Sequence, residues 1–380
     1  MIFQVDDVEF KHLGFGAFYH QDGIAHNVGA GVDAQNYFFR KNEGRRFYHK
    51  IYKITNKNLN VVLKSKGWLA LKFLIFALTS FYLYKAVQGR TDFFNLLQGQ
   101  TGSGTWIFVG LAAGLILVNW ALEAWKWWLL AQKIEPVSYA RAFRSVMVGL
   151  TLGFITPNRV GDYAGRILEL RSKKRVNAIG AIFLGRFAQL VITLVAGSAG
   201  GFYLFWHFYL PDFPWTKIGI GLFLLSCNLF GLLFFFRASL ILALLASFRP
   251  ARRIIPYLRV LSQYTFSDLG YTLLLAFARY LVFALQFGLL LQAFGIRVPF
   301  FDFFSCIAST FLLKSIVPSL SAITDIGMRE ISAMHFFSLF GQPEINVLGA
   351  SLSLWFMNIV LPSAIGLIFV ARLKRRKETR

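Results

Sequence analysis

Acidic residues are scarce in this 380-residue chain, which carries 18 Asp and Glu against 40 Lys and Arg, a formal net charge of +22. Such a surplus can indicate nucleic-acid binding, but here the basic residues collect in short runs between apolar segments. That distribution is typical of the cytoplasmic loops of membrane proteins. We therefore expect no nucleic-acid partner.

Cysteines and the motifs of soluble enzymes are also sparse. Cys227 and Cys306 lie in apolar segments and are interpreted as small core residues, without a disulfide framework. The sequence contains no glycine-rich phosphate loop, zinc-protease helix or GxSxG turn. His335 has no His or Cys at metal-binding spacing, so we interpret it as a packed helix residue. We expect a non-enzyme without catalytic residues, metal or cofactor.

Long apolar runs dominate the chain instead. Hydrophobic residues make up 56% of the sequence, and the mean hydropathy is +0.54. These values predict an all-α polytopic membrane protein. Segment 239–248 is expected to lie along the membrane interface. Six full transmembrane crossings are expected at 67–87, 105–129, 177–205, 218–236, 266–294 and 345–371.

The basic runs also predict the domains and the topology. Residues 1–66 form a basic amino-terminal extension, 67–371 a transmembrane domain, and 372–380 a basic tail. Residues 1–40 lack the basic-then-apolar layout of a signal peptide. Because Lys and Arg concentrate in loops that stay inside, we expect a multi-pass plasma-membrane protein with both termini in the cytoplasm.

The segment 150–170 is apolar at first and then breaks at Thr156-Pro157-Asn158. Proline removes a backbone donor and clashes with the preceding turn, so the incoming helix should stop near Thr156. A helix from Arg141 to Thr156 would be roughly 24 Å long, short of the ~30 Å hydrocarbon core. Basic clusters stand on both sides of the segment. These features predict a re-entrant helical hairpin that enters from the cytoplasm and returns there.

A second segment of this kind lies downstream. We expect a helix at 303–317 that ends at Pro318, a polar break, and a resumed helix at 331–340. Weakly charged loops flank it, so it should enter from outside. Crossing, hairpin and crossing would then occur twice in opposite orientation, which is a transporter-like inverted repeat. A pair of short true crossings in place of each hairpin is the alternative.

Charges within these apolar regions are the candidate binding groups. Each costs on the order of 2.5–3.5 kcal/mol at the centre of an inserted helix, so several together need partners or water. One interpretation is a polar cavity whose arginines bind phosphate. The substrate-binding candidates are Thr156, Pro157, Asn158, Arg159, Gly161, Asp162, Arg166, Arg186, Arg279, Pro318, Asp325, Gly327, Arg329 and Glu330.

The alternative interpretation is that these charges pair internally and stabilise the fold. Asp162 and Arg166 are spaced i,i+4 and would meet on a helix, whereas the adjacent Arg329 and Glu330 would point in different directions. Aromatic residues near the end of the crossing at 105–129 are interpreted as an interfacial belt with a snorkelling lysine. They are Trp120, Trp125, Trp127 and Trp128, with Lys126.

Two short motifs carry a resemblance to a known family. The stretch from Thr156 to Asp162 resembles the Pro-x-x-x-Gly-Glu element of flippase-like integral membrane proteins, which are similar to the transmembrane region of lysylphosphatidylglycerol synthetase. The stretch from Ile326 to Glu330 resembles their second element, which ends in Gly-x-Arg-Glu. Asp162 replaces the usual Glu, and Thr324-Asp325 replace paired glycines. The resemblance covers roughly residues 65–375.

The resemblance implies a membrane lipid flippase or transporter for an anionic phospholipid or a polyprenyl-phosphate glycolipid. Because the chain ends at Arg380, it is expected to lack the soluble aminoacyl-transferring domain and to move or bind lipid. One alternative is a membrane-embedded lipid-phosphate enzyme that uses Asp162, Asp325 or Glu330 as acid or base. Another is a non-transporting partner subunit of a glycosyltransferase. A homo-oligomer also stays open.

Overall fold

The computed structural model describes residues 103–156, 159–172, 175–208, 214–247, 254–316 and 325–378. The chain divides into two compact units, Met1–Ala77 and Leu78–Arg380, and every described residue belongs to the second. The predicted extension at 1–66 and the predicted crossing at 67–87 lie outside the described residues, as do Pro157, Asn158 and Pro318. Every regular element among the described residues is helical, which confirms the predicted all-α class.

Five helices in the described part of the chain are long and apolar enough to cross a membrane. They coincide with five of the six predicted crossings, and such helices suit a bilayer because their backbone polar groups are satisfied internally. Their bounds are α4 Ser103–Ala131, α7 Ala178–Phe208, α8 Pro214–Phe236, α11 Phe266–Ala293, and the run of α14 Glu344–Trp355, η7 Phe356–Val360 and α15 Leu361–Glu378.

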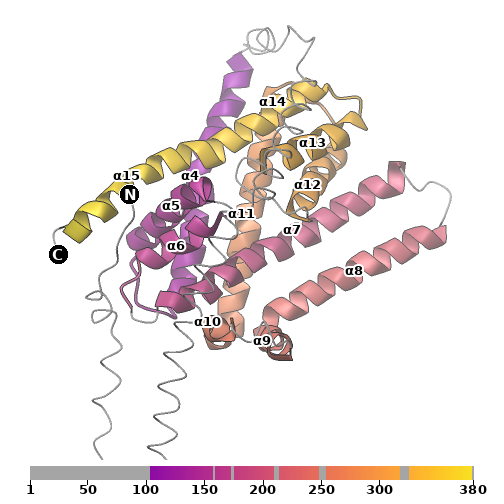
Figure 1. Ribbon diagram of the computed structural model, residues 1–380. Coiled ribbons are helices and arrows are strands. Elements are labelled where there is room, and N and C mark those ends of the chain that lie inside the picture. The colour runs from indigo at the N-terminus through magenta and orange to yellow at the C-terminus, as the bar shows by residue number, and fades with distance from the viewer. Residues whose placement is uncertain are drawn as a thin grey trace, which may run out of the picture. The chain divides into compact units, whose positions relative to one another are not determined.

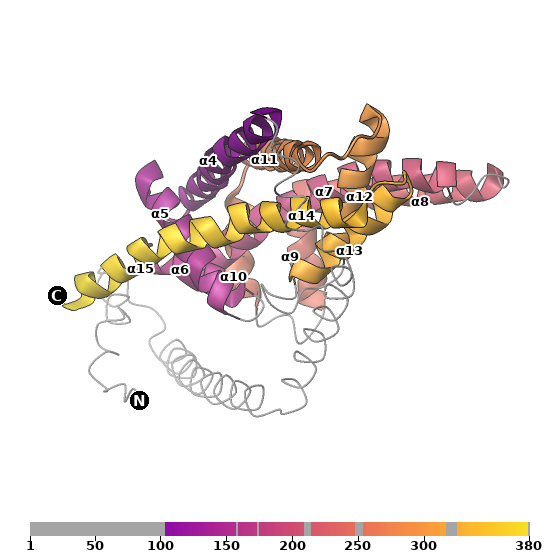
Figure 2. The same ribbon diagram turned by 90° about the horizontal axis from the view of Figure 1, so that it is seen from above.

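Close helix pairs organise this unit, as Figures 1 and 2 show for α4 and α11. These two run antiparallel, and the Gln286 side chain donates to the Ala112 carbonyl across the contact. Helix α7 packs on α12 (Phe300–Ile316). Gly197 permits that approach, because a Cβ there would lie 2.3 Å from the Leu312 Cβ. Small residues serve this purpose in many membrane-helix contacts.

The first predicted break is a helical hairpin. Helix α5 (Tyr139–Ile155) ends at Thr156, whose backbone is extended, and α6 (Val160–Leu168) follows Arg159, which has a left-handed backbone with φ 54°. The Thr156 hydroxyl accepts from the Gly161 amide at 2.7 Å and donates to the Leu152 carbonyl at 2.8 Å. One side chain therefore connects the two helices across the turn.

The second break is also a hairpin, but the resumed helix begins earlier than predicted. Helix α13 covers Asp325–Ser338 and packs antiparallel on α12, with the Cys306 thiol donating to the Phe336 carbonyl. The predicted start at Ile331 is therefore wrong, and Gly327 to Glu330 are helical. Arg329 and Glu330 are compatible with a buried helix because they bind each other and Ser351.

The short element η4 (Arg175–Asn177) precedes α7, and among the described residues three further short elements lie between α8 and α11 along the chain. Helix α9 (Ala238–Ser247) occupies the segment expected along the interface, followed by α10 (Ile255–Leu258) and η6 (Arg259–Gln263). A capping box at Thr265 and Asp268 starts α11. The last crossing continues as helix to Glu378, beyond the predicted end at 371.

Candidate functional site

A cavity of about 420 Å³ lies between the two hairpins and the helices α4, α7 and α11, and we call it the charged cavity. The first hairpin contributes Phe154 and Arg159, and the end of α12 contributes Lys314 and Ser315. The two predicted breaks therefore border one space. Six cationic and two acidic side chains line it: Lys126, Arg159, Arg166, Arg186, Arg279 and Lys314, with Glu123 and Asp162.

Glycines on α5 and α6 position Asp162 at this cavity. A Cβ at Gly149 would lie 2.5 Å from the Asp162 Oδ1, and one at Gly153 would lie 3.3 Å from its Cβ. A Cβ at Gly165 would lie 2.5 Å from the Gly149 nitrogen. The close packing of α5 on α6 therefore requires glycine at positions 149 and 165. The candidates Gly161 and Asp162 are thus parts of one tightly packed surface.

Arg166 is held between two carboxylates. Its Nε donates to the Asp162 Oδ1 at 3.0 Å, and its Nη2 donates to the Glu123 Oε1 at 2.9 Å. The guanidinium lies 5.5 Å from the centre of the Trp127 ring, and the side chain is only 8% exposed. The internal pairing considered for Asp162 and Arg166 is therefore present, and Arg166 also bridges to Glu123 on another helix.

Glu123 is the centre of the ionic network. Its carboxylate contacts the Lys126 Nζ at 2.7 Å and the Arg279 Nη1 at 3.3 Å, in addition to Arg166. Sequence reasoning missed Glu123, although an acid in the predicted crossing at 105–129 was a usable signal. The assignment of Lys126 as a snorkelling lysine was wrong, because its side chain is buried in this pair.

Trp120 and Trp127 are also buried, which corrects their assignment to an interfacial belt. The Arg279 guanidinium lies 5.4 Å from the Trp120 ring centre, so this tryptophan, like Trp127, supports an arginine of the network. Trp125, in contrast, is exposed on the surface of α4, as a belt residue would be. The sequence cluster therefore combines two roles.

Arg186 and Arg279 are the cavity arginines with donors that protein groups leave available. Arg186, on α7, pairs with the Asp162 Oδ2 through one nitrogen, lies over Tyr163 and keeps 40% of its side chain exposed. Arg279, on α11, makes a long 3.5 Å contact to the Gln189 Oε1, and 22% of its side chain is exposed at the cavity. A guanidinium carries five N–H donors, so both can bind a further anion.

Arg329 and Glu330 lie elsewhere, in a buried cluster between α13 and α14. The Arg329 Nε donates to the Ser351 Oγ at 2.9 Å, its Nη2 donates to Glu330, and the Ser351 hydroxyl donates to Glu330 at 3.1 Å. These adjacent residues therefore pair on a helix, and neither lines the charged cavity. Gly327 is buried in the same helix, and the Asp325 side chain lies outside the described structure.

A chain of buried amides lies beside the cavity and was also missed. Asn119 donates to the Asn358 Oδ1 at 2.7 Å, and Asn358 donates to the Gln286 Oε1 at 2.8 Å. Asn358 stands in the π-helical turn η7, whose Ile359 lines the cavity. In the part of the chain that the structure describes, no three His, Cys, Asp or Glu side chains gather as metal ligands.

These features define a polytopic helical membrane protein whose helices surround a strongly cationic cavity. The family described as the lysylphosphatidylglycerol synthase TM region has a sequence model that matches residues 69–366, more than half of the chain. The chain therefore belongs to this family, which confirms the resemblance carried by the two short motifs. No curated protein and no solved structure matches the chain.

Proposed function

We propose that the protein is a lipid flippase or transporter that binds the phosphate of a membrane lipid in the charged cavity. Four cations of the cavity lining, Lys126, Arg166, Arg186 and Arg279, share two carboxylates, Glu123 and Asp162, and this excess of positive charge carries the proposal. Unbalanced charges are expensive among apolar helices, so the cavity is suited to an anionic ligand that completes the balance. Lipids whose head groups carry a phosphate supply that charge.

A lipid is the favoured source of the phosphate because the cavity borders the apolar surface. Leu190 lines the cavity and is also 45% exposed on the outer face of α7. A head group can therefore sit in the cavity while its chains stay among the apolar side chains. An anionic phospholipid and a polyprenyl-phosphate glycolipid share this chemistry, and both belong in the test.

Each residue of the network has a separate task in this proposal. Arg186 and Arg279 donate to the phosphate oxygens, since both side chains are partly exposed at the cavity and guanidinium matches phosphate geometry. Glu123 and Asp162 hold those arginines in place, with Arg166 between the two carboxylates. Because arginines occupy both Asp162 oxygens, this carboxylate is poorly suited to proton transfer, and we propose no catalytic role for it.

We further propose that the two hairpins are re-entrant from opposite faces of the plasma membrane. Helices α5 and α12 have 17 residues each, about 25 Å, less than the ~30 Å hydrocarbon core. Their partners α6 and α13, with 9 and 14 residues, are shorter still. An inverted repeat around a midplane site would permit alternating access. The basic tail favours a cytoplasmic carboxyl terminus.

The test is a scrambling assay in reconstituted vesicles with fluorescent phosphatidylglycerol, a labelled polyprenyl phosphate and an uncharged glycosyl diacylglycerol, whose sugar head group prevents rapid spontaneous movement. Wild type should move at least one phosphate-bearing lipid and leave the uncharged one in place. Arg186→Gln and Arg279→Gln should each reduce transport at low lipid concentration, while the exposed Arg259→Gln should not. If the protein neither transports nor binds any of the phosphate-bearing lipids, the proposed function is excluded.

A further inference from the structure

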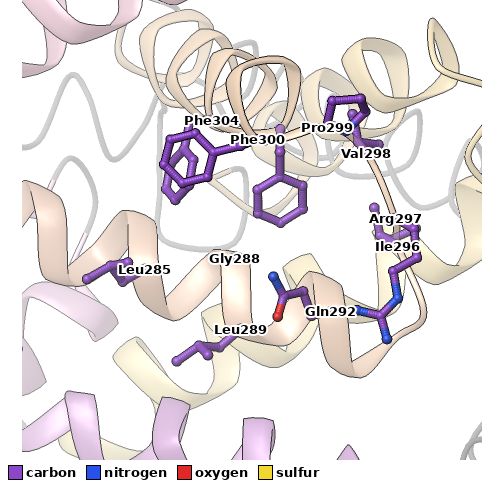
Figure 3. A pocket seen from close by; sticks show the side chains of 11 residues that line it. Leu285, Gly288, Leu289, Gln292, Ile296, Arg297, Val298, Pro299, Phe300 and Phe304 are labelled. Carbon is purple, nitrogen blue, oxygen red and sulfur yellow. The ribbon is translucent and has the colours of Figure 1, made fainter.

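A second hollow of about 650 Å³ lies between the end of α11 and the start of α12, and we call it the α11–α12 groove. It shares no lining residue with the charged cavity. Figure 3 shows the loop after α11 closing one end of the groove. Its lining is Leu285, Gly288, Leu289, Gln292, Ile296, Arg297, Val298, Pro299, Phe300, Phe303 and Phe304.

The groove has a polar end and an apolar end. In Figure 3 the Arg297 guanidinium and the Gln292 amide lie at the loop end, while Leu285 and Phe304 lie at the other. The glycine at 288 keeps the floor open, because a Cβ there would already lie 3.1 Å from the Phe303 ring. An amphipathic molecule that lies along α11 would place its polar group at the first end and its apolar part at the second.

Two apolar side chains of the groove lie on the exposed surface. Phe300, at the start of α12, is 70% exposed, and Leu285, on the candidate membrane span α11, is 48% exposed. Arg297 is exposed at the end of α11, where a membrane-crossing helix meets the head-group layer. Arginine at that depth places its charged end among phosphates while its stem stays on apolar surface. From Gln292 to Leu285 is about 10 Å along the helix, so an acyl chain follows the groove below the head group.

We infer that the α11–α12 groove is a second lipid site, which takes one anionic phospholipid. Its phosphodiester accepts hydrogen bonds from Arg297 and the Gln292 amide, and one acyl chain lies against Leu285, Leu289 and Phe304. Charge complementarity selects an anionic lipid over a neutral or zwitterionic one, because the groove lining contains one cation and no acid. The inference does not depend on the proposed transport, because the groove and the charged cavity share no lining residue.

Photo-crosslinking in nanodiscs of mixed phosphatidylglycerol and phosphatidylcholine tests the site. The probe p-benzoylphenylalanine replaces Phe304 or Leu289 in the groove, or the exposed Leu225 on α8 as the control position. Mass spectrometry of the crosslinked product identifies the lipid. We expect phosphatidylglycerol to be enriched at both groove positions on the order of tenfold over the bilayer composition. The control position should follow the bilayer composition.

Substitutions at Arg297 separate the head-group contact from mere access to lipid. Arg297→Gln should return the crosslinked lipid to the bilayer composition while the total crosslinking yield at Phe304 persists. Arg297→Lys, which keeps the charge, should retain most of the enrichment. The inference would be overturned if the lipid crosslinked to the wild-type groove had the composition of the bilayer. It would also be overturned if the enrichment survived Arg297→Gln, or if the probe crosslinked to a second protein molecule.

Discussion

Removing the Glu123 carboxylate should destabilise the protein strongly, because three cations depend on it. Lys126, Arg166 and Arg279 approach Glu123 at 2.7, 2.9 and 3.3 Å, and the glutamate is buried. Breaking a buried ion pair by removing one partner costs about 3–5 kcal/mol, because the remaining charge stays buried and uncompensated. Glu123→Gln keeps the side-chain shape, so the free energy of unfolding should fall by about this amount.

The assay is equilibrium unfolding in mixed micelles, followed by circular dichroism. Glu344→Gln, at the exposed start of α14, is the matched control and should change the free energy of unfolding by less than about 1 kcal/mol. Adding Lys126→Met to Glu123→Gln should recover part of the loss, since one uncompensated cation is removed. A Glu123→Gln effect no larger than that of the control would refute the ionic network as described.

Three further predictions use the same unfolding assay or a lipid-binding assay. Gly165→Ala should destabilise by about 1–3 kcal/mol through overpacking against the α5 backbone, whereas Gly114→Ala, with open space around it, should be neutral or stabilising; equal effects would contradict the hairpin packing. Arg329→Met should cost about 3–5 kcal/mol by leaving Glu330 buried and unpaired, yet the folded fraction should bind lipid with unchanged affinity. Arg279→Lys keeps the charge but replaces the planar guanidinium with an ammonium group, so lipid affinity should fall roughly tenfold with little loss of stability; unchanged affinity would exclude guanidinium-specific binding of the phosphate.

The sequence was a good guide wherever a single local property decides the structure. Apolar runs predicted the membrane helices, and Thr156-Pro157 predicted the end of α5 because proline cannot continue a helix. The i,i+4 spacing of Asp162 and Arg166 predicted their ion pair. The start of α13 could not be predicted in the same way, because Arg329 and Glu330 have a partner on another helix, Ser351, that the local sequence does not indicate.

The centre of the charged cavity depends on contacts between distant segments. Glu123 meets Arg166 and Arg279 only after α4, α6 and α11 have packed together, and nothing local to Glu123 indicates both partners. Burial of Trp127 follows from the same packing, since Arg166 lies over its ring. Spacing rules describe neighbours on one helix, so they cannot assign such a network.

The measurement that tests the central claim most directly is native mass spectrometry of the purified protein with its bound lipids. Wild type and an Arg186→Gln/Arg279→Gln variant are compared after the same extraction. If the charged cavity holds a lipid phosphate, wild type should retain one more phosphate-bearing lipid than the variant. Equal lipid counts in the two proteins would contradict the account.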